Sequence, residues 1–95
     1  MAQPSYVLET KTLRELASSP KCRFIWTRHA LREVFADGRV EADVEYALTN
    51  CQVVLQEQKK DVLWRAVGRD LDGKRVQIVV AVFEEAITIK VVTTF

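Results

Sequence analysis

Several patterns that would mark a membrane, secreted or repeat protein are missing from this sequence of 95 residues. No apolar run approaches the roughly 20 residues that span a bilayer, and the first residues lack the basic-then-apolar pattern of a secretory signal peptide. The chain has no internal repeat and no low-complexity segment. We therefore expect a single domain located in the cytoplasm, with no membrane partner.

Metal ligands and disulfide partners are also scarce. Cys22 and Cys51 lie far apart among apolar residues, and neither belongs to a Cys-x-x-Cys pair. His29 is the single histidine of the chain, whereas a structural zinc site needs four close ligands. These features predict two buried thiols, no disulfide, no metal ion and no cofactor.

A large excess of either charge is missing as well, since the net charge is +1. This value argues against a protein that coats nucleic acid without specificity. The charges nevertheless alternate in blocks: residues 21–39 hold five basic and two acidic side chains, and residues 40–61 hold two basic and five acidic ones. Two interpretations stay open, namely one basic surface that steers a polyanion, or the mixed surface of an ordinary globular protein.

The spacing of the apolar residues predicts an α+β domain. We expect a short helix over 10–19, a strand over 22–26, helices over 28–36 and 41–48, and strands over 51–58, 62–69, 75–83 and 87–95. Tight connections, including the Asp72-Gly73 turn, make the last four strands an antiparallel meander. The two helices after the first strand should cover one face of this sheet. Residues 1–20 would form an arm, extended to Thr10 and then helical, and residues 21–95 the single domain.

The segment 26–35 is the first candidate for a functional site. Strand-forming residues stop at Thr27, whose hydroxyl can cap the helix that follows, and this places Arg28 and His29 in the first helical turn. Free backbone amides, the positive end of the helix dipole and these two side chains would attract an anion such as phosphate. The alternative is that Arg28, His29 and Arg32 simply form the solvated side of an amphipathic helix.

A second basic feature follows from the two-residue period of strands. In the strand over 62–69, Arg65 and Arg69 fall on one face, whereas Trp64 and Ala66 fall on the other. If the two arginines face away from the helices, they form a basic row on the open side of the sheet. Arginine suits this role because its planar group makes two-pronged contacts with phosphate.

Short motifs spread over residues 24–95 form a set. They are His29-Ala30-Leu31, Gly38, Asp43-Val44, Ala47-Leu48, Asp72-Gly73-Lys74 and Val91-Val92-Thr93-Thr94-Phe95. Together they resemble a bacterial family of small proteins of unknown function with a His-Ala motif, which is itself similar to the RelE/ParE and BrnT toxins. The resemblance implies a RelE-like toxin fold and a metal-independent endoribonuclease that cleaves messenger RNA. It also implies an antitoxin protein as partner and RNA or the ribosome as target.

Five positions of the chain match the motifs of that family, and four depart from them. The matches are Thr27, His29 and Ala30 in the opening motif, Gly38 in the loop and Thr93 near the end. The departures are Glu33 and Asp37 in place of arginines, Val40 in place of a small helix cap, and Phe95 in place of a terminal tyrosine. The loss of two cations and one hydroxyl argues for a binding module without catalysis.

Cleavage of RNA would need an acid or base and positive charge around the phosphate. The catalytic candidates are His29 and Arg32, and the candidates for binding phosphate or RNA are Arg28, Arg65, Arg69 and Thr93. Two alternatives without catalysis stay open. One is a protein-binding module that keeps the toxin fold, with the arm around Tyr6–Leu8 or an edge strand making homodimer contacts. The other is an RNA-binding protein that does not cleave its ligand.

Overall fold

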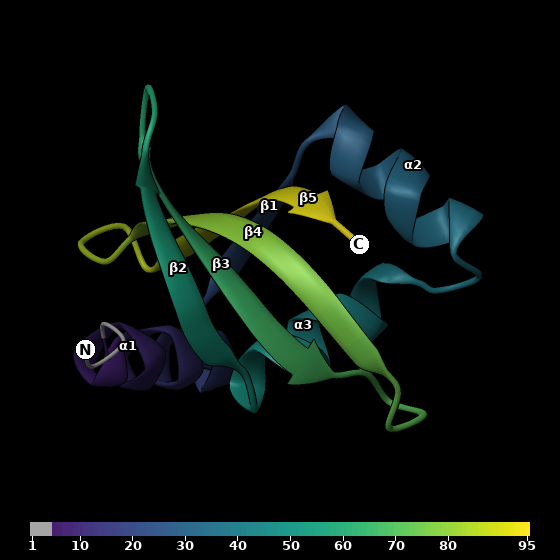
Figure 1. Cartoon of the computed structure of the whole chain (residues 1–95), viewed down its shortest axis with the longest axis horizontal. Coiled ribbons are helices and arrows are strands. Elements are labelled where there is room, and N and C mark those ends of the chain that lie inside the picture. Colours follow the sequence, from purple (N-terminus) through teal and green to yellow (C-terminus); the bar gives the residue numbers. More distant parts are fainter. Residues whose placement is uncertain (1–4) are drawn as a thin grey trace.

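Residues 5–95 are described by the computed structural model, and they form three helices and one five-stranded sheet. The elements in chain order are α1 (Val7–Ser18), β1 (Arg23–Trp26), α2 (Arg28–Ala36), α3 (Glu41–Thr49), β2 (Gln52–Gln58), β3 (Val62–Arg69), β4 (Arg75–Phe83) and β5 (Thr88–Thr94). The α+β class and the order of the elements are those predicted from the sequence (Figure 1). Within the described part of the chain, every helix is too short or too polar to cross a membrane.

The first helix begins earlier than the sequence pattern indicates. An extended arm is predicted up to Thr10, but the chain is helical from Val7 onward. Residues 1–4 of the predicted arm lie outside the described residues. Leu13 and Ala17 of α1 are buried in the same apolar cluster as side chains of the sheet. The helix therefore contributes directly to the core.

The sheet contains one strand more than the predicted meander. Its order is β1-β5-β4-β3-β2. Neighbouring strands from β2 to β5 pair antiparallel, whereas β1 pairs parallel with β5. The sheet is therefore mixed and five-stranded, and the prediction of a four-stranded antiparallel sheet is incomplete. The strand β1 itself was predicted, but its place in this sheet was not. It pairs Arg23 with Thr88, near the other end of the chain, and local periodicity carries no information on such a distant partner.

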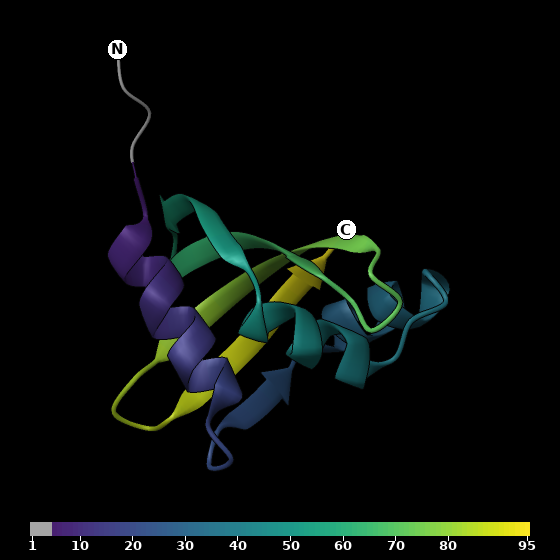
Figure 2. The ribbon, with the colours of Figure 1, turned by 90° about the horizontal axis from the view of Figure 1, so that it is seen from below.

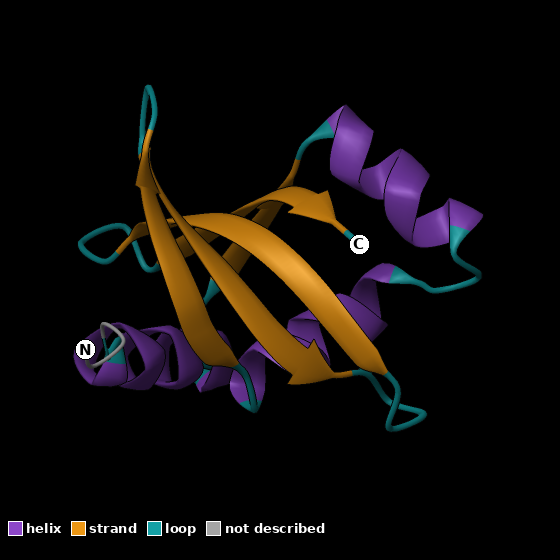
Figure 3. Cartoon of the chain, in the orientation of Figure 1, coloured by secondary structure: helices purple, strands orange, loops and turns teal. Residues whose placement is uncertain are grey.

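Two helices cover one face of the sheet, but they are not the two expected. α3 packs against β3 and β4, and α1 packs against α3 and β2. Figure 2 shows both helices on the same side of these strands. The helix α2 instead packs mainly against β5 and lies beside the end of that strand (Figure 3). Within residues 5–95, the other face of β2, β3 and β4 is left without a helix (Figure 1).

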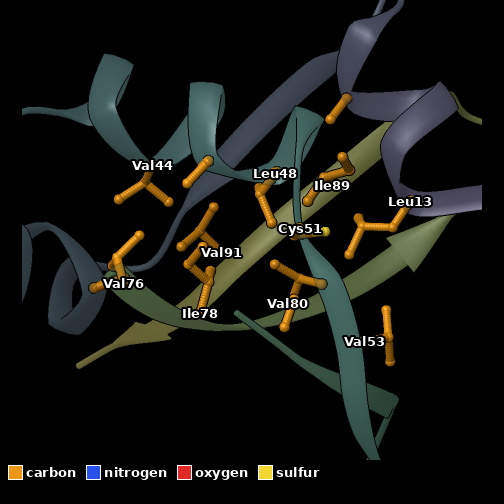
Figure 4. Packing of buried hydrophobic residues seen from close by; sticks show 14 of the residues in the cluster. Leu13, Val44, Leu48, Cys51, Val53, Val76, Ile78, Val80, Ile89 and Val91 are labelled. Atoms are coloured by element: carbon orange, nitrogen blue, oxygen red, sulfur yellow. The ribbon is translucent and has the colours of Figure 1, made fainter. Parts of the chain in front are cut away.

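The core lies between the helical layer and the sheet (Figure 4). Its largest fully buried side chains include Leu13 of α1, Leu48 of α3 and Ile89 of β5. Cys51 belongs to the same cluster, and burial raises the pKa of its thiol to about 11, so the thiol stays protonated near neutral pH. Cys22 is also predicted to be buried, but its side chain is only partly covered.

Asp70 joins the hairpin between β3 and β4 to the loop that follows α2. Its carboxylate accepts hydrogen bonds from Arg39 Nε at 2.9 Å and from the backbone N–H groups of Asp72 and Lys74 at 2.9 and 2.8 Å. The hydrogen bond from Arg39 is the main reason why the pKa of the Asp70 carboxyl lies below its ordinary value of 3.8. The charged form of Asp70 is therefore favoured by the folded chain.

Replacing Asp70 with asparagine is expected to change how stability depends on pH. Because its pKa is lowered by folding, Asp70 stabilises the fold above its ordinary pKa, and this contribution is lost as the pH falls through the lower folded value. The free energy of unfolding of Asp70→Asn should lie below that of the wild type near neutral pH and approach it in acid. Urea denaturation followed by circular dichroism at several pH values measures this. Glu85→Gln, an exposed carboxylate in the hairpin between β4 and β5, should follow the wild type, and a deficit of Asp70→Asn that is constant with pH would contradict the prediction.

Candidate functional site

The first turn of α2 is fixed by Thr27, as the sequence predicts. The Thr27 hydroxyl accepts a hydrogen bond from the Ala30 backbone N–H at 3.1 Å, which makes Thr27 the N-cap of the helix. The same hydroxyl donates to the backbone oxygen of Val92 at 3.0 Å. These two bonds join the start of α2 to β5, and they place Arg28 and His29 in the first turn.

His29 and Glu33 face each other across one turn of α2. The distance between His29 Nε2 and Glu33 Oε1 is 3.2 Å, and the His29 side chain is 70% exposed. A carboxylate only accepts hydrogen bonds, so in the neutral imidazole the Nε2 atom carries the hydrogen. The Nδ1 atom then keeps a free lone pair, and it is the atom of His29 that can accept a proton.

Glu33 also ties α2 to the end of β5. Its Oε1 atom accepts hydrogen bonds from the Thr93 hydroxyl at 2.7 Å and from the Thr94 backbone N–H at 3.2 Å. Thr93, predicted to bind phosphate, therefore gives its hydroxyl hydrogen to Glu33. We call the three residues His29, Glu33 and Thr93 the His29 cluster. It fixes the position of His29 relative to the sheet.

Arg65 and Arg69 lie on the face of the sheet that is left without a helix. The predicted basic row on the open side of the sheet required this orientation. The residues that alternate with them point toward the helices. Ala66 is buried, and a Cβ atom on Gly68 would collide with the backbone oxygen of Ala47 in α3. Because successive side chains of a strand point to opposite faces, Arg65 and Arg69 point away from α3.

The strand register places Arg65 in line with the His29 cluster. Thr93 pairs with Val79, and Val79 pairs with Arg65, so the three residues form one row across β5, β4 and β3. Neighbouring strands lie about 4.8 Å apart, so the backbones of Arg65 and Thr93 are roughly 10 Å from each other. A ligand that contacts both the His29 cluster and Arg65 therefore needs to span only two strands.

Further cations share this face of the sheet. According to the strand registers, it carries Arg23, Arg65, Arg69, Arg75 and Lys90, and Glu57 is the one acidic residue of the five strands on it. We call this surface the basic face. The period of a single strand predicts only Arg65 and Arg69 of these cations, because the faces of β1, β4 and β5 follow from their pairing with other strands.

Arg65 is held on the basic face by an aromatic ring and a carboxylate. Its Cζ atom lies 5.2 Å from the centroid of the Phe95 ring, within the range of a cation–π interaction. Its Nη2 atom lies 4.0 Å from Glu57 Oε1. The Phe95 residue is 54% exposed, so an aromatic surface is open to a ligand beside the guanidinium group.

The predicted site residues form two groups rather than one. Arg28 and Arg32 are exposed on α2 with His29, and the ion pairs found within residues 5–95 include neither arginine. Arg65 and Arg69 belong to the sheet. Arg69 lies four residues from Arg65, roughly 14 Å along the strand, and therefore far from the His29 cluster.

Glu33 is the site residue whose role was not predicted from the sequence. The sequence shows it only as a departure from the family pattern. The spacing of His29 and Glu33 was a local signal for their contact, because residues four apart in a helix are neighbours. The contact between Glu33 and Thr93 joins residues 60 positions apart, and no pattern in the sequence indicates it.

An acidic cluster lies away from this site. The carboxylates of Asp43, Asp70 and Asp72 come within 4.8 Å of one another. Asp70 is engaged by Arg39 and by backbone N–H groups. Asp43 accepts hydrogen bonds from two further backbone N–H groups, at 3.1 and 3.3 Å. These bonds give the cluster a structural role in joining α3 to the hairpin between β3 and β4.

Comparison with known proteins gives one match. The family model described as Domain of unknown function (DUF4258) matches residues 26–95. No curated protein and no solved structure matches the chain. The matched segment includes the whole His29 cluster and all cations of the basic face except Arg23, and it begins after α1.

Proposed function

The chain belongs to the family described as Domain of unknown function (DUF4258), and we propose that it acts as a RelE/ParE- and BrnT-like toxin that cleaves messenger RNA. The observation that carries this proposal is the position of His29, which Glu33 holds at the margin of the basic face. A group that transfers protons and a surface that binds polyanions would then act on one substrate. A RelE-like fold belongs to the same proposal, and it is supported by the resemblance of the short motifs to a family that is itself similar to these toxins.

His29 is the proposed general base. In this mechanism the 2′-hydroxyl of a ribose attacks the neighbouring phosphate, and its proton passes to Nδ1 of His29. The bond from phosphorus to the departing 5′ oxygen breaks, and that oxygen takes a proton from water. Arg28 and Arg32 lie within the first two turns of α2 and would stabilise the negative charge that builds on the phosphate.

The basic face is the proposed surface for the rest of the RNA strand. Arg65 would contact a phosphate beside the one attacked, because it shares a row with Thr93 of the His29 cluster. The exposed ring of Phe95 would stack on a base next to that phosphate. These contacts favour single-stranded RNA, whose bases are free to stack. An antitoxin partner would inhibit the protein by covering this face.

Glu33 also supports a second candidate, a binding protein without catalysis. In this alternative the carboxylate only fastens α2 to β5 through Thr93 and Thr94. Within the His29 cluster the Thr93 hydroxyl is already bonded to Glu33, so the cluster offers no second group to protonate the departing oxygen. RNA would then bind to the basic face without being cut, or a protein partner would occupy the face.

Growth and RNA measurements test the proposed function directly. Induced expression of the wild-type chain in bacteria should arrest growth, and messenger RNA should be lost within the same period. Normal growth with intact RNA, from protein that is verified as folded, would overturn the toxin proposal. Binding of RNA without cleavage by the purified protein would then support the second candidate.

The role of Arg65 is tested by RNA binding at several salt concentrations. Arg65→Gln is expected to weaken binding of a single-stranded RNA oligonucleotide several-fold and to reduce the salt slope by about one, because one phosphate contact is lost. Fluorescence anisotropy measures both quantities. Lys11→Gln, which removes a charge from α1 on the other side of the sheet, is the matched control and should bind as the wild type does. Equal weakening by both substitutions would contradict a specific role for the basic face.

A further inference from the structure

A β-bulge turns the end of β5 onto the basic face. Lys90 of β5 pairs with Ala81 of β4. Two residues earlier in β4, Val79 pairs with Thr93, which lies three residues after Lys90. Because residues three apart in a regular strand point to opposite faces, the extra residue of the bulge is what places Thr93 on the same face as Lys90. Phe95, two residues further on, follows Thr93 onto this face.

Phe95 and Gln77 lie directly opposite each other on the basic face. The Phe95 N–H donates to the Gln77 backbone oxygen at 2.9 Å, and the Gln77 N–H donates to the Phe95 backbone oxygen at 3.5 Å. Antiparallel residues that exchange both bonds have their Cα atoms about 5.5 Å apart, and their side chains share one face. With the Arg65 guanidinium group near its ring, Phe95 is still 54% exposed. An exposed ring and an amide side chain are therefore neighbours.

The side-chain amide of Gln77 is open to solvent. Its neighbours Val76 and Ile78 are buried in the core, so Gln77 points away from the helices. Gln56 and Gln58 use their amides in hydrogen bonds at 3.1 and 3.3 Å, whereas no hydrogen bond of the Gln77 amide is found within residues 5–95. The buried side-chain atoms without a partner in this part of the chain do not include the amide either. Its N–H groups and its oxygen can therefore bond to a ligand.

Charged, amide and apolar groups surround the Phe95 ring. Arg65 carries the charge, and a cation beside an exposed ring favours a phosphate close to a stacked base. Val67, which pairs with Gln77, and Val79, two residues along β4, are apolar neighbours on the same face. The Gln77 amide is uncharged, and it can donate and accept in the plane of a base edge. Gln77 is therefore the uncharged residue beside the ring that can recognise a base.

We propose that Phe95 and Gln77 bind one base of the RNA strand and that Gln77 selects adenine. This inference rests on the proposed function, in which single-stranded RNA lies on the basic face. Proteins recognise the bases of such RNA on their Watson–Crick and Hoogsteen edges. Adenine alone offers a donor beside an acceptor on both edges, so either edge can form two hydrogen bonds with an amide. Guanine and the pyrimidines offer such a pair only on the Watson–Crick edge.

Binding of RNA that cannot be cleaved tests this inference on the full chain. Short uridine oligonucleotides with 2′-O-methyl groups, in which one central base is uracil, adenine, cytosine or guanine, are compared by fluorescence anisotropy. The wild type is expected to bind the adenine oligonucleotide about fivefold more tightly than the guanine one, whose base has rings of the same size. Gln77→Leu should bind these two alike. Gln52→Leu is the matched control and should keep the preference, because Gln52 lies on the same face but three strands from Phe95.

The outcomes separate this inference from the proposed function. Binding of all four oligonucleotides without a preference for adenine would overturn the base-binding site and leave RNA binding to the basic face in place. A preference for another base, or an adenine preference that persists in Gln77→Leu, would overturn the selection of adenine by Gln77. Absence of binding to any oligonucleotide would contradict the proposed function itself, and this inference with it. If circular dichroism shows that Gln77→Leu does not fold, Gln77→Glu replaces it, because a carboxylate keeps the shape but cannot donate.

Discussion

Replacing His29 with alanine is expected to lower the rate of RNA cleavage by roughly 10²–10⁴-fold, the usual contribution of a positioned acid or base. In the proposed mechanism Nδ1 of His29 accepts the proton, and neither Glu33 nor Thr93 is placed to replace it, because both are engaged in holding the cluster together. The His29 side chain is mostly exposed, so thermal stability should change little. Growth arrest on induction and loss of messenger RNA should both disappear.

Two further variants separate chemistry from positioning. Glu33→Gln keeps an oxygen that can accept the hydrogen bond from Thr93 but no longer offers a charged acceptor to His29, so an intermediate loss of cleavage is expected. Arg32→Ala should lose less than His29→Ala, because Arg28 remains in the same part of α2. Purified protein, a labelled single-stranded RNA and a time course on a gel suffice for the comparison. Equal cleavage by the wild type and His29→Ala would show that the helix start is a solvated surface.

Replacing Gly68 with alanine is expected to destabilise the fold by about 3 kcal/mol, at the upper end of the cost of overpacking a core. A Cβ atom at this position would overlap the backbone oxygen of Ala47, and its next contacts are the carbonyl carbon and the Cβ atom of the same residue. Backbone atoms of a packed helix cannot move aside as the tip of a side chain can. The helix α3 must therefore shift away from β3, and core contacts such as those of Leu48 are loosened.

Gly73→Ala provides the comparison for this prediction. Gly73 has a φ angle of 78°, and no atom lies within 4 Å of where its Cβ atom would be placed. An alanine there should destabilise the fold only by the strain of a left-handed backbone conformation, about 1–2 kcal/mol. Urea denaturation and the thermal midpoint measure both variants. A larger loss of stability for Gly73→Ala than for Gly68→Ala would show that β3 and α3 are not in tight contact.

The start of the candidate site was predictable because it depends on neighbours in sequence. Thr27 caps α2 through an N–H three residues away, and the same local geometry places Arg28 and His29 in the first turn. The spacing of His29 and Glu33 is also local, although its meaning was missed. The Glu33 side chain was expected to weaken the site, whereas it holds His29 in place through contacts with β5.

The layer of helices was predicted less well. Apolar spacing correctly indicated that α2 and α3 each have one apolar side, but it did not indicate the strands against which each helix packs. A hydrogen bond from Thr27 to Val92 joins the start of α2 to β5. The helix α1 occupies the position beside α3 that was predicted for α2. The sequence pattern of α1 was too short to show that Leu13 reaches the core.

The sequence by itself determined the class of the fold, the order of its elements, the cap at Thr27 and the alternation that separates Arg65 from Ala66. All of these depend on interactions within a few residues, where the chain has little conformational choice. Only the tertiary structure decided that β1 pairs with β5, that Glu33 contacts Thr93, and that the cations of four strands share one face. Those features depend on which distant segments meet, and that choice is made by the packing of the whole core.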